Sequence, residues 1–177
     1  MKFLNVIDES EEGFKIIADK LFNEYVIKTH DSEFRIIEME FYWNSPTHVD
    51  NSTYPRKYVN PNSGEWFFHY SGVDIALKNE KGHGGILLRG VCKINNKGET
   101  DKDDIYKGPL VTVMRLFSGT SAFSDNIKTK LVRRNFSTSE IKQSKRIGLG
   151  KNAIENGAKD FKYRFSINVN YKSWKLL

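Results

Sequence analysis

The run from Arg35 to Trp43 constrains the fold more than any other part of the sequence, because it predicts a long β-strand with two distinct faces. Successive side chains of a strand point to opposite faces, so residues two positions apart share a face. Ile37, Met39 and Phe41 therefore lie on one face together with Trp43. We expect this face to pack into the core of a sheet.

The opposite face of the same strand carries two carboxylates, Glu38 and Glu40, between Ile36 and Tyr42. Acidic side chains beside apolar neighbours suit the wall of a pocket better than an ordinary solvated face. Glu38 and Glu40 are therefore the first candidates for chemistry. The alternative is an edge strand whose glutamates meet water or lysines.

Length and composition indicate one soluble domain that covers residues 1–177. The sequence has no stretch of ~18 apolar residues that would span a membrane, and it turns acidic at Asp8 before a signal-peptide core could form. The single cysteine, Cys92, has no partner for an internal disulfide, which agrees with a reducing compartment. We expect a cytoplasmic monomer with no membrane association.

The excess positive charge is concentrated in one segment. The net charge of the whole chain is +6, and the segment from residue 128 to residue 146 accounts for all of it, with seven basic residues against Glu140. Such a segment predicts a binding surface for a polyanion such as DNA or RNA, although a solvated basic face would have the same composition. The candidate nucleic-acid-binding residues are Lys128, Lys130, Arg133, Arg134, Lys145 and Arg146, and Lys142 lies in the same segment.

Apolar spacing and turn residues predict an alternation of strands and short helices. A helix is expected over residues 10–23 with Ser10 as N-cap, and a second helix is expected to start at Pro109 and to pack through Leu110, Val113, Met114 and Phe117. Strands are expected at 25–29, 34–43, 73–78, 86–91 and 163–169, with an aromatic block at 66–70 and loops at 44–63 and 95–107.

The sequence lacks the common motifs of metal, phosphate and nucleotide sites. The four histidines lie far apart and Cys92 has no partner at ligand spacing, so we expect no metal and no cofactor. Arg89 lies in the apolar strand 86–91 and needs an acidic partner, for which the strand glutamates are the natural candidates. Carboxylates, an arginine and aromatic side chains suit hydrolysis by a base-activated water with stacking of a flat substrate.

The order of short motifs resembles the methylpurine-DNA glycosylases, which excise damaged purines. The family strand R-I-V-E-T-E-A-Y is similar to residues 35–42, and its aromatic hairpin block is similar to residues 64–72. The family strand G-A-x-L-L-R-A is similar to residues 84–90, its G-P helix start to Gly108-Pro109, and its R-I-G-V-G turn to residues 146–150. A histidine is matched by His48, a T-P-R-N stretch loosely by residues 53–57, and the final aromatic strand by residues 163–174.

The resemblance implies a single α+β domain with a curved antiparallel sheet and a role in base excision repair. It implies that Glu40 is the general base and that Arg89 helps to position the attacking water, with the carbonyl of Ile147 as a further water ligand. Glu38 would support its neighbour by shifting its pKa or by pairing with Arg89. Tyr42 and His48 would pack on one side of the flipped base and Phe68 on the other, and the side chain inserted into the vacated stack would be Ser71 or Tyr70.

The partner implied by the resemblance is DNA, with double-stranded DNA as the expected form. Two other functions remain open on the sequence alone. The chain would be a non-catalytic nucleic-acid-binding protein if it kept the fold and lost the inserted side chain. It would be a hydrolase of a nucleoside or a single-stranded substrate if nothing had to be unstacked.

Overall fold

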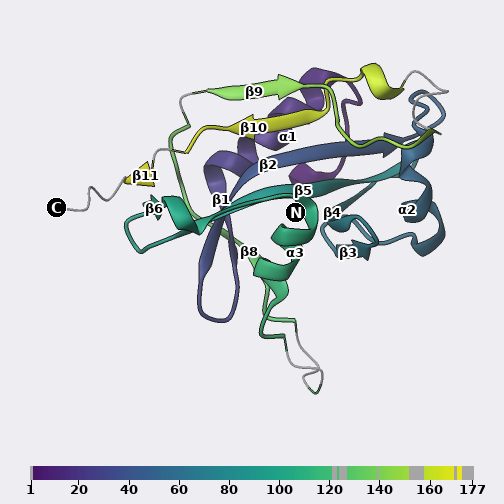
Figure 1. The fold of residues 1–177 in the computed structure, drawn as a ribbon. Helices are drawn as coiled ribbons and strands as arrows, with labels where there is room; N and C mark the ends of the chain where they lie inside the picture. Colours follow the sequence, from purple (N-terminus) through teal and green to yellow (C-terminus); the bar gives the residue numbers. More distant parts are fainter. Residues whose placement is uncertain are drawn as a thin grey trace.

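A nine-stranded antiparallel sheet forms the body of the protein, as seen in the computed structural model (Figure 1). The structure describes residues 2–120, 123, 127–138, 140–151, 158–169 and 171–172. The sheet contains β1 (Tyr25–Lys28), β2 (Glu33–Asn44), β3 (Trp66–His69), β4 (Gly72–Lys78), β5 (His83–Ile94), β7 (Ile105–Lys107), β8 (Lys130–Arg133), β9 (Ile141–Ser144) and β10 (Arg164–Ile167). A separate parallel pair joins β6 (Thr100–Asp101) to β11 (Tyr171–Lys172).

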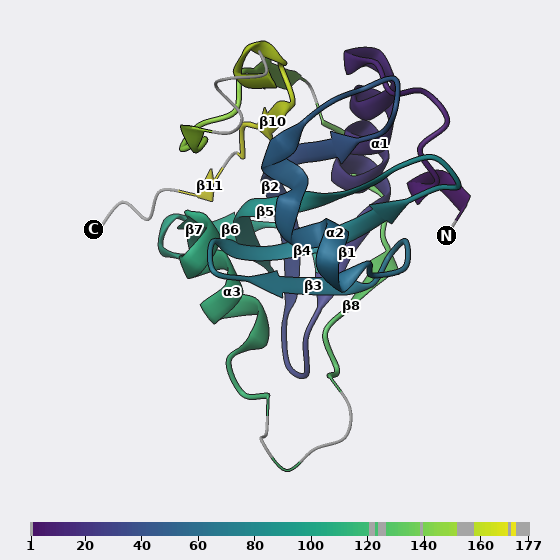
Figure 2. The ribbon, with the colours of Figure 1, turned by 90° about the vertical axis from the view of Figure 1, so that its right-hand side faces the viewer.

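Three α-helices accompany the sheet in the described residues: α1 (Glu11–Glu24), α2 (Tyr54–Val59) and α3 (Pro109–Phe117). Short 3-10 segments occur at Lys2–Leu4, Asn51–Thr53, Lys102–Asp104 and Ala158–Asp160. Two views show α1 and α3 at opposite sides of the curled sheet (Figures 1 and 2). The predicted α+β fold with a curved antiparallel sheet is confirmed. Within the described residues, no helix combines the length and the apolar character that crossing a membrane requires.

The strand β2 is the centre of the sheet. One of its edges pairs with β5 along its whole length, from Glu33 to Asn44. Its other edge is shared, because β1 pairs with the beginning of β2 and β10 pairs with the stretch from Glu38 to Glu40. The middle of β2 is therefore enclosed by strands on both sides, which makes it the most sheltered place for a polar side chain.

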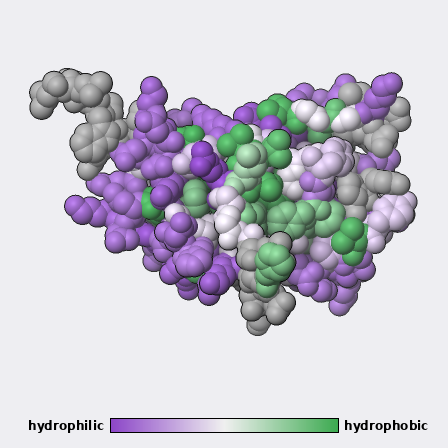
Figure 3. Space-filling model, turned by 60° about the horizontal axis from the view of Figure 1, so that its bottom comes forward, coloured by the Kyte–Doolittle hydropathy of each residue, from purple (hydrophilic) through white to green (hydrophobic). Residues whose placement is uncertain are grey.

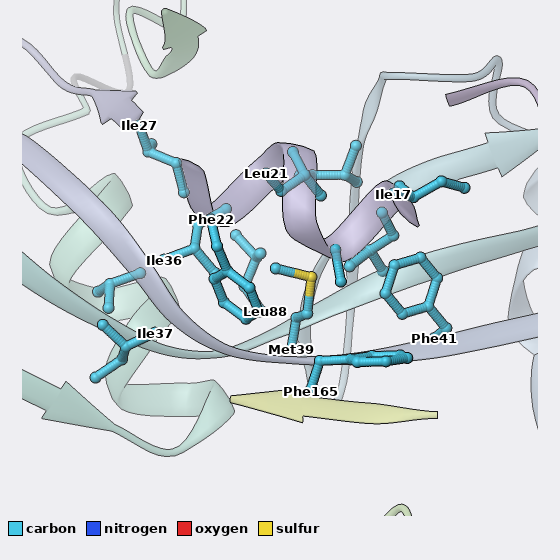
Figure 4. Close-up of a cluster of buried hydrophobic side chains, with 14 of the residues drawn as sticks. Ile17, Leu21, Phe22, Ile27, Ile36, Ile37, Met39, Phe41, Leu88 and Phe165 are labelled. Atoms are coloured by element: carbon cyan, nitrogen blue, oxygen red, sulfur yellow. The ribbon is translucent and has the colours of Figure 1, made fainter. Parts of the chain in front are cut away.

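The helix α1 covers one face of the sheet and creates the main core. The Ser10 hydroxyl accepts a hydrogen bond from the Gly13 N–H at 3.2 Å, so the predicted N-cap is confirmed. Leu21 and Phe22 are fully buried on the side of Met39 (Figure 4), and the fully buried Phe14 contacts the Phe41 ring at 5.1 Å between centroids. The predicted hydrophobic face of β2 is thus the face that meets the helix.

The pairing of β2 with β5 is distorted at the predicted site. Residues on the two strands pair in one register as far as Ile36 with Val91, and the same register resumes at Met39 with Leu88. In between, Glu38 lies opposite Gly90, which leaves Ile37 and Arg89 outside the ladder. The carbonyl of Arg89 instead accepts a hydrogen bond from the N–H of Gly108 at 2.7 Å. This irregularity aims the Arg89 side chain and anchors the start of α3.

The two predicted loops contain more regular structure than expected. Segment 44–63 includes a 3-10 turn and α2, whose Pro55 occupies a first-turn position, and segment 95–107 includes β6, a 3-10 turn and β7. The helix α2 has six residues, which is too short to show a hydrophobic period in the sequence. Its proline indicated a loop in the sequence, whereas it lies in the first turn of the helix. The trailing part of the final predicted strand, including Trp174, lies outside the described residues.

The orientation of α3 differs from the prediction. The helix forms at the expected residues, but the buried positions are Thr112 and Leu116, whereas Leu110 and Met114 are 65% and 62% exposed. Val113 and Phe117 are half-buried against the core. The predicted apolar stripe is therefore correct for Val113 and Phe117 and wrong for Leu110 and Met114, which point to solvent.

A tryptophan joins the two ends of the sheet. β3 and β8 are the terminal strands of the main strand order, and the indole N–H of Trp66 on β3 donates to the carbonyl of Thr129 next to β8 at 2.9 Å. The Trp66 ring also makes an edge contact with Phe117, 5.5 Å between centroids. A side chain thus closes the curled sheet where backbone pairing does not.

We expect Trp66→Phe to lower the free energy of unfolding by about 1 kcal/mol, because the ring contact with Phe117 survives while the hydrogen bond to Thr129 is lost. Urea denaturation with an unchanged slope would measure this difference. A variant as stable as the wild type would show that the seam between β3 and β8 does not depend on the indole N–H.

Candidate active site

The carboxylate of Glu40 is fully buried at the sheltered centre of β2. It lies between Leu87 of β5 and Arg164 of β10, its partners across the sheet. Oε1 accepts the backbone N–H of Ile147 at 2.9 Å. Oε2 accepts the Tyr42 hydroxyl at 2.9 Å and Nη1 of Arg89 at 3.2 Å. A carboxylate can accept about four hydrogen bonds, and these donors supply three, so one further donor can be accommodated.

Two opposing influences act on the pKa of Glu40, and burial is the stronger one. Loss of solvent raises the pKa, whereas the N–H of Ile147 and the Arg89 guanidinium lower it. The result is a pKa above the ordinary value of glutamate. A carboxylate in this state has a higher proton affinity than a solvated one, which is the property a general base requires.

Arg89 links the two glutamates of the strand. Its Nε donates to Oε1 of Glu38 at 3.1 Å and its Nη1 donates to Glu40. Nε of Arg164 reaches the same Glu38 oxygen at 2.9 Å. The prediction that Arg89 pairs with the strand glutamates is confirmed, and Glu38 acts here as the shared acceptor that holds two arginines in place.

Tyr42 contributes its hydroxyl to Glu40, while its ring is covered by cations. The guanidinium carbons of Arg56 and Arg146 lie 4.5 and 4.6 Å from the ring centroid, and the residue is 8% exposed. Burial and the neighbouring Glu40 raise the pKa of the Tyr42 hydroxyl, so the phenol stays protonated and acts as a donor. The guanidinium groups stack on the flat face of the Tyr42 ring, and this is the face that the ring would offer to a base.

The structure corrects the prediction for Arg146, which was expected to contact nucleic acid. Its side chain has no exposed surface, and its Nη1 donates to Oδ2 of Asp50 at 2.7 Å and to the carbonyl of Phe41 at 3.1 Å. Nη2 donates to the carbonyl of Ala158 at 2.9 Å. Arg146 therefore joins three segments of the chain and fixes the position of the following residue, Ile147.

A second buried ion pair lies on the same face of the sheet. Arg56 of α2 pairs with Asp74 of β4, which is fully buried, and Nε2 of His69 donates to Oδ1 of Asp74 at 3.0 Å. Nδ1 of His69 accepts the N–H of Ser71 at 3.3 Å, so the ring proton is on Nε2 and Nε2 is the donor to Asp74. A side chain at Gly85 would collide with Arg56, since an added Cβ would lie 2.7 Å from its Nε.

Sequence reasoning missed Asp50, Arg56 and Asp74. The available signal was Asp74, an acid within the otherwise apolar strand β4, which by the argument applied to Arg89 required a buried cation. Arg56 and Asp50 lay in a segment expected to be a loop, where charged residues are ordinary.

The ring contacts of His48 and Phe68 join these residues to aromatic side chains other than Tyr42. His48 packs against Phe161 and Tyr163, and its Nε2 lies 3.3 Å from the Tyr163 hydroxyl. Phe68 contacts Phe117 at 4.7 Å between ring centroids and is 45% exposed. None of these contacts joins His48 or Phe68 to Tyr42. His48 and Phe68 therefore belong to different aromatic clusters, and the His48 cluster reaches Tyr42 through Arg146, which packs on the rings of both Tyr163 and Tyr42.

Tyr70 and Ser71 form the turn between β3 and β4. Tyr70 is 93% exposed, so it has the exposure that an inserted side chain would need. Ile147, the last predicted member, is 46% exposed while its N–H holds Glu40. The side of the carboxylate next to Ile147 is thus the side nearest to solvent.

The basic segment is divided between two places. β8 pairs with β1 at the end of the sheet, whereas β9 pairs with β10 on the other branch. Arg133 pairs with Glu24, Arg134 with Glu33 and Lys145 with Asp160. Lys128, Lys130 and Lys142 are exposed. The cations therefore do not form the single footprint that their order in the sequence suggested.

Among residues placed by the structure, no cluster of three or more His, Cys, Asp or Glu side chains could hold a metal ion. The groups that converge around Glu40 are instead arginines, a tyrosine hydroxyl and a backbone N–H. This set donates hydrogen bonds to the Glu40 carboxylate and partly offsets the effect of burial on its pKa.

No protein-family model matches the chain. The chain is 29% identical over 136 residues to uncharacterized protein L759 of Acanthamoeba polyphaga mimivirus. This match covers 62% of the chain and 58% of the viral protein, so the chain spans less than two thirds of the length of that relative.

Replacement of Glu40 by glutamine should change how stability depends on pH. Because burial raises the pKa of Glu40, its contribution to stability is fully present below its ordinary pKa of 4.5 and is lost as the pH rises through the raised value. We therefore expect the free energy of unfolding of the wild type, relative to Glu40→Gln, to fall above pH 4.5. Urea titrations of both proteins from pH 4 to 8 measure this difference; a difference that increases with pH would contradict the dominance of burial.

Replacement of Arg146 should be far more damaging than replacement of its neighbour. Arg146→Met leaves Asp50 buried without its cation, so we expect a loss of about 3–5 kcal/mol in the free energy of unfolding. Lys145→Met, which removes an exposed ion pair with Asp160, should cost about 0–1 kcal/mol and is the matched control. Equal effects of the two variants in urea denaturation would argue against an anchoring role of Arg146.

Proposed function

We propose that this protein is a divergent DNA N-glycosylase that hydrolyses the bond between a damaged purine and its deoxyribose. The observation that carries the proposal is the convergence of Arg89, Tyr42 and the backbone N–H of Ile147 on the buried carboxylate of Glu40. The resemblance to the methylpurine-DNA glycosylases assigned Glu40, Arg89 and the carbonyl of Ile147 to water activation and Tyr42 to packing on the base, and these residues come from three distant parts of the sequence.

In the proposed reaction Glu40 accepts a proton from a water molecule bound at its remaining acceptor position. The water oxygen forms a bond to the anomeric carbon of the sugar, and the electron pair of the N-glycosyl bond leaves with the purine. The raised pKa of Glu40 supports this assignment, because it increases the affinity of the carboxylate for the proton. Arg89 and the N–H of Ile147 keep the carboxylate oriented.

Glu38 has a supporting role in this proposal. It accepts Nε of Arg89 and Nε of Arg164, so it fixes the plane of the Arg89 guanidinium while Nη1 reaches Glu40. Its side chain is 14% exposed, whereas that of Glu40 is fully buried. Two carboxylates on one face are thus divided into a base and a positioning residue by their surroundings.

A specific observation favours a second function, non-catalytic binding of nucleic acid. Glu40 has no exposed surface, and Arg56 and Arg146 cover the Tyr42 ring. Entry of a purine requires at least one guanidinium to leave that ring. Both guanidinium groups are held by buried carboxylates, Arg56 by Asp74 and Arg146 by Asp50, so entry of a purine would break one of these ion pairs.

The test is release of a damaged base from DNA. Duplex and single-stranded oligonucleotides with hypoxanthine, ethenoadenine or 3-methyladenine are incubated with the protein, and abasic sites are cleaved by alkali and counted; the free nucleosides form a further arm. We expect Glu40→Gln to lower the rate about 10²–10⁴-fold, because it keeps the shape of the side chain but removes the base.

The controls separate catalysis from folding and binding. Glu38→Gln should lower the rate less than Glu40→Gln, because Arg89 keeps its contact with Glu40. Base release that is equal in wild type and Glu40→Gln would refute the proposed role of Glu40. Binding of DNA without release of any base would favour the non-catalytic function.

A further inference from the structure

An exposed apolar surface extends over α3 and the hairpin of β3 and β4. We call it the α3 platform and define it by Phe68, Tyr70, Leu110, Val111 and Met114. Their exposed fractions range from 42% for Val111 to 93% for Tyr70. The view from this side of the molecule shows apolar surface gathered at its centre (Figure 3). An apolar patch of this kind on a protein surface indicates a binding partner.

The two parts of the α3 platform are held together by packing. A Cβ at Gly72, beside the hairpin tip, would lie 3.0 Å from Cβ of Pro109, so the tip rests on the first turn of α3. At the other end of the helix, Phe117 contacts Phe68. The hairpin and the helix therefore present one continuous surface.

The α3 platform adjoins the proposed active site. The N–H of Gly108, immediately before α3, donates to the carbonyl of Arg89, and Arg89 contacts Glu40. An added Cβ at Gly72 would also lie 3.0 Å from Cδ1 of Leu87, which is paired with Glu40 across the sheet. The platform and the carboxylate are therefore connected through β5.

Basic residues lie in the segments that form the α3 platform, and Asp104 accepts the hydroxyl of Tyr106, on whose ring Arg115 packs. Segments 66–73, 107–118 and 127–130 contain no aspartate or glutamate. Their charged residues are all basic and exposed: Lys107, Arg115, Lys128 and Lys130. A surface that combines exposed aromatic and aliphatic side chains with cations complements a ligand that has both flat apolar faces and negative charge.

We propose that the α3 platform binds the unpaired nucleotides of a single DNA strand, next to the nucleotide whose base enters the site. The bases of a single strand expose flat faces that stack on Tyr70 and Phe68, and its phosphates pair with the surrounding cations. A duplex hides those faces inside its own stack. This inference rests on the proposed function and replaces the expected double-stranded substrate with a single-stranded one.

The experiment is fluorescence anisotropy with a labelled 15-nucleotide oligothymidine and with the same strand annealed to its complement. We expect the single strand to bind at least about tenfold more tightly than the duplex. Tyr70→Ala should weaken binding of the single strand about tenfold, and Tyr70→Trp should retain it, because stacking needs an aromatic face and no hydroxyl. Arg115→Gln should reduce the slope of log affinity against log salt by about 0.7.

The matched control is Ile16→Ala, which removes an exposed apolar side chain of similar exposure, 60%, from α1 on the other side of the molecule. It should bind the single strand as the wild type does. A second platform variant, Met114→Ser, should weaken binding, and thermal unfolding verifies that each variant is folded. Equal or tighter binding of the duplex, or wild-type affinity of Tyr70→Ala, would overturn the inference.

Two further outcomes have distinct meanings. Concentration-dependent dimers in size-exclusion chromatography that Met114→Lys abolishes, without binding of the single strand, would show a protein interface and overturn the inference. Tight binding of the single strand without base release from any substrate would refute the proposed glycosylase activity and leave this inference standing. Base release from duplex DNA at a rate that Tyr70→Ala does not change would support the glycosylase activity and overturn this inference.

Discussion

The buried carboxylate of Glu40 is the constraint on which the surrounding structure depends. A charged group without solvent needs donors within hydrogen-bond distance, and this one obtains them from β2 itself, from β5 and from the segment that follows β9. Each donor has its own support. Arg89 is held by Glu38, and Ile147 is held by the anchored Arg146. The polar layer is therefore a connected network, and its parts have to be understood together.

Much of the fold was predictable because its signals are local. The N-cap at Ser10, the alternation along β2 and the short turn between β1 and β2 are each encoded within a few residues. The pairing of Arg89 with Glu38 and Glu40 was also predictable, since an arginine in an apolar strand needs a carboxylate and the sequence offered two on a neighbouring strand. Polar residues inside apolar strands were the most informative positions in the chain.

The errors share a different physical origin. The burial of Arg146 could not be inferred from a count of charges, because a count does not distinguish a solvated cation from one paired with Asp50 inside the protein. The rotation of α3 could not be inferred from its apolar stripe, because the stripe shows which side chains avoid water and does not show which of them the sheet can cover. Both errors concern long-range contacts that join segments far apart in sequence.

The irregular pairing around Arg89 has a consequence for how such a site can change. The register of β2 with β5 is the same on both sides of the distortion, so each strand contributes two residues to the irregular stretch and the ladder resumes without a shift. A substitution at Arg89, whose side chain contacts Glu38 and Glu40, can therefore alter the chemistry of the site while the strand ends keep their partners. Removal of a single residue would instead move one half of β2 to the wrong face. The sheet tolerates new side chains at its centre more readily than a change in its length.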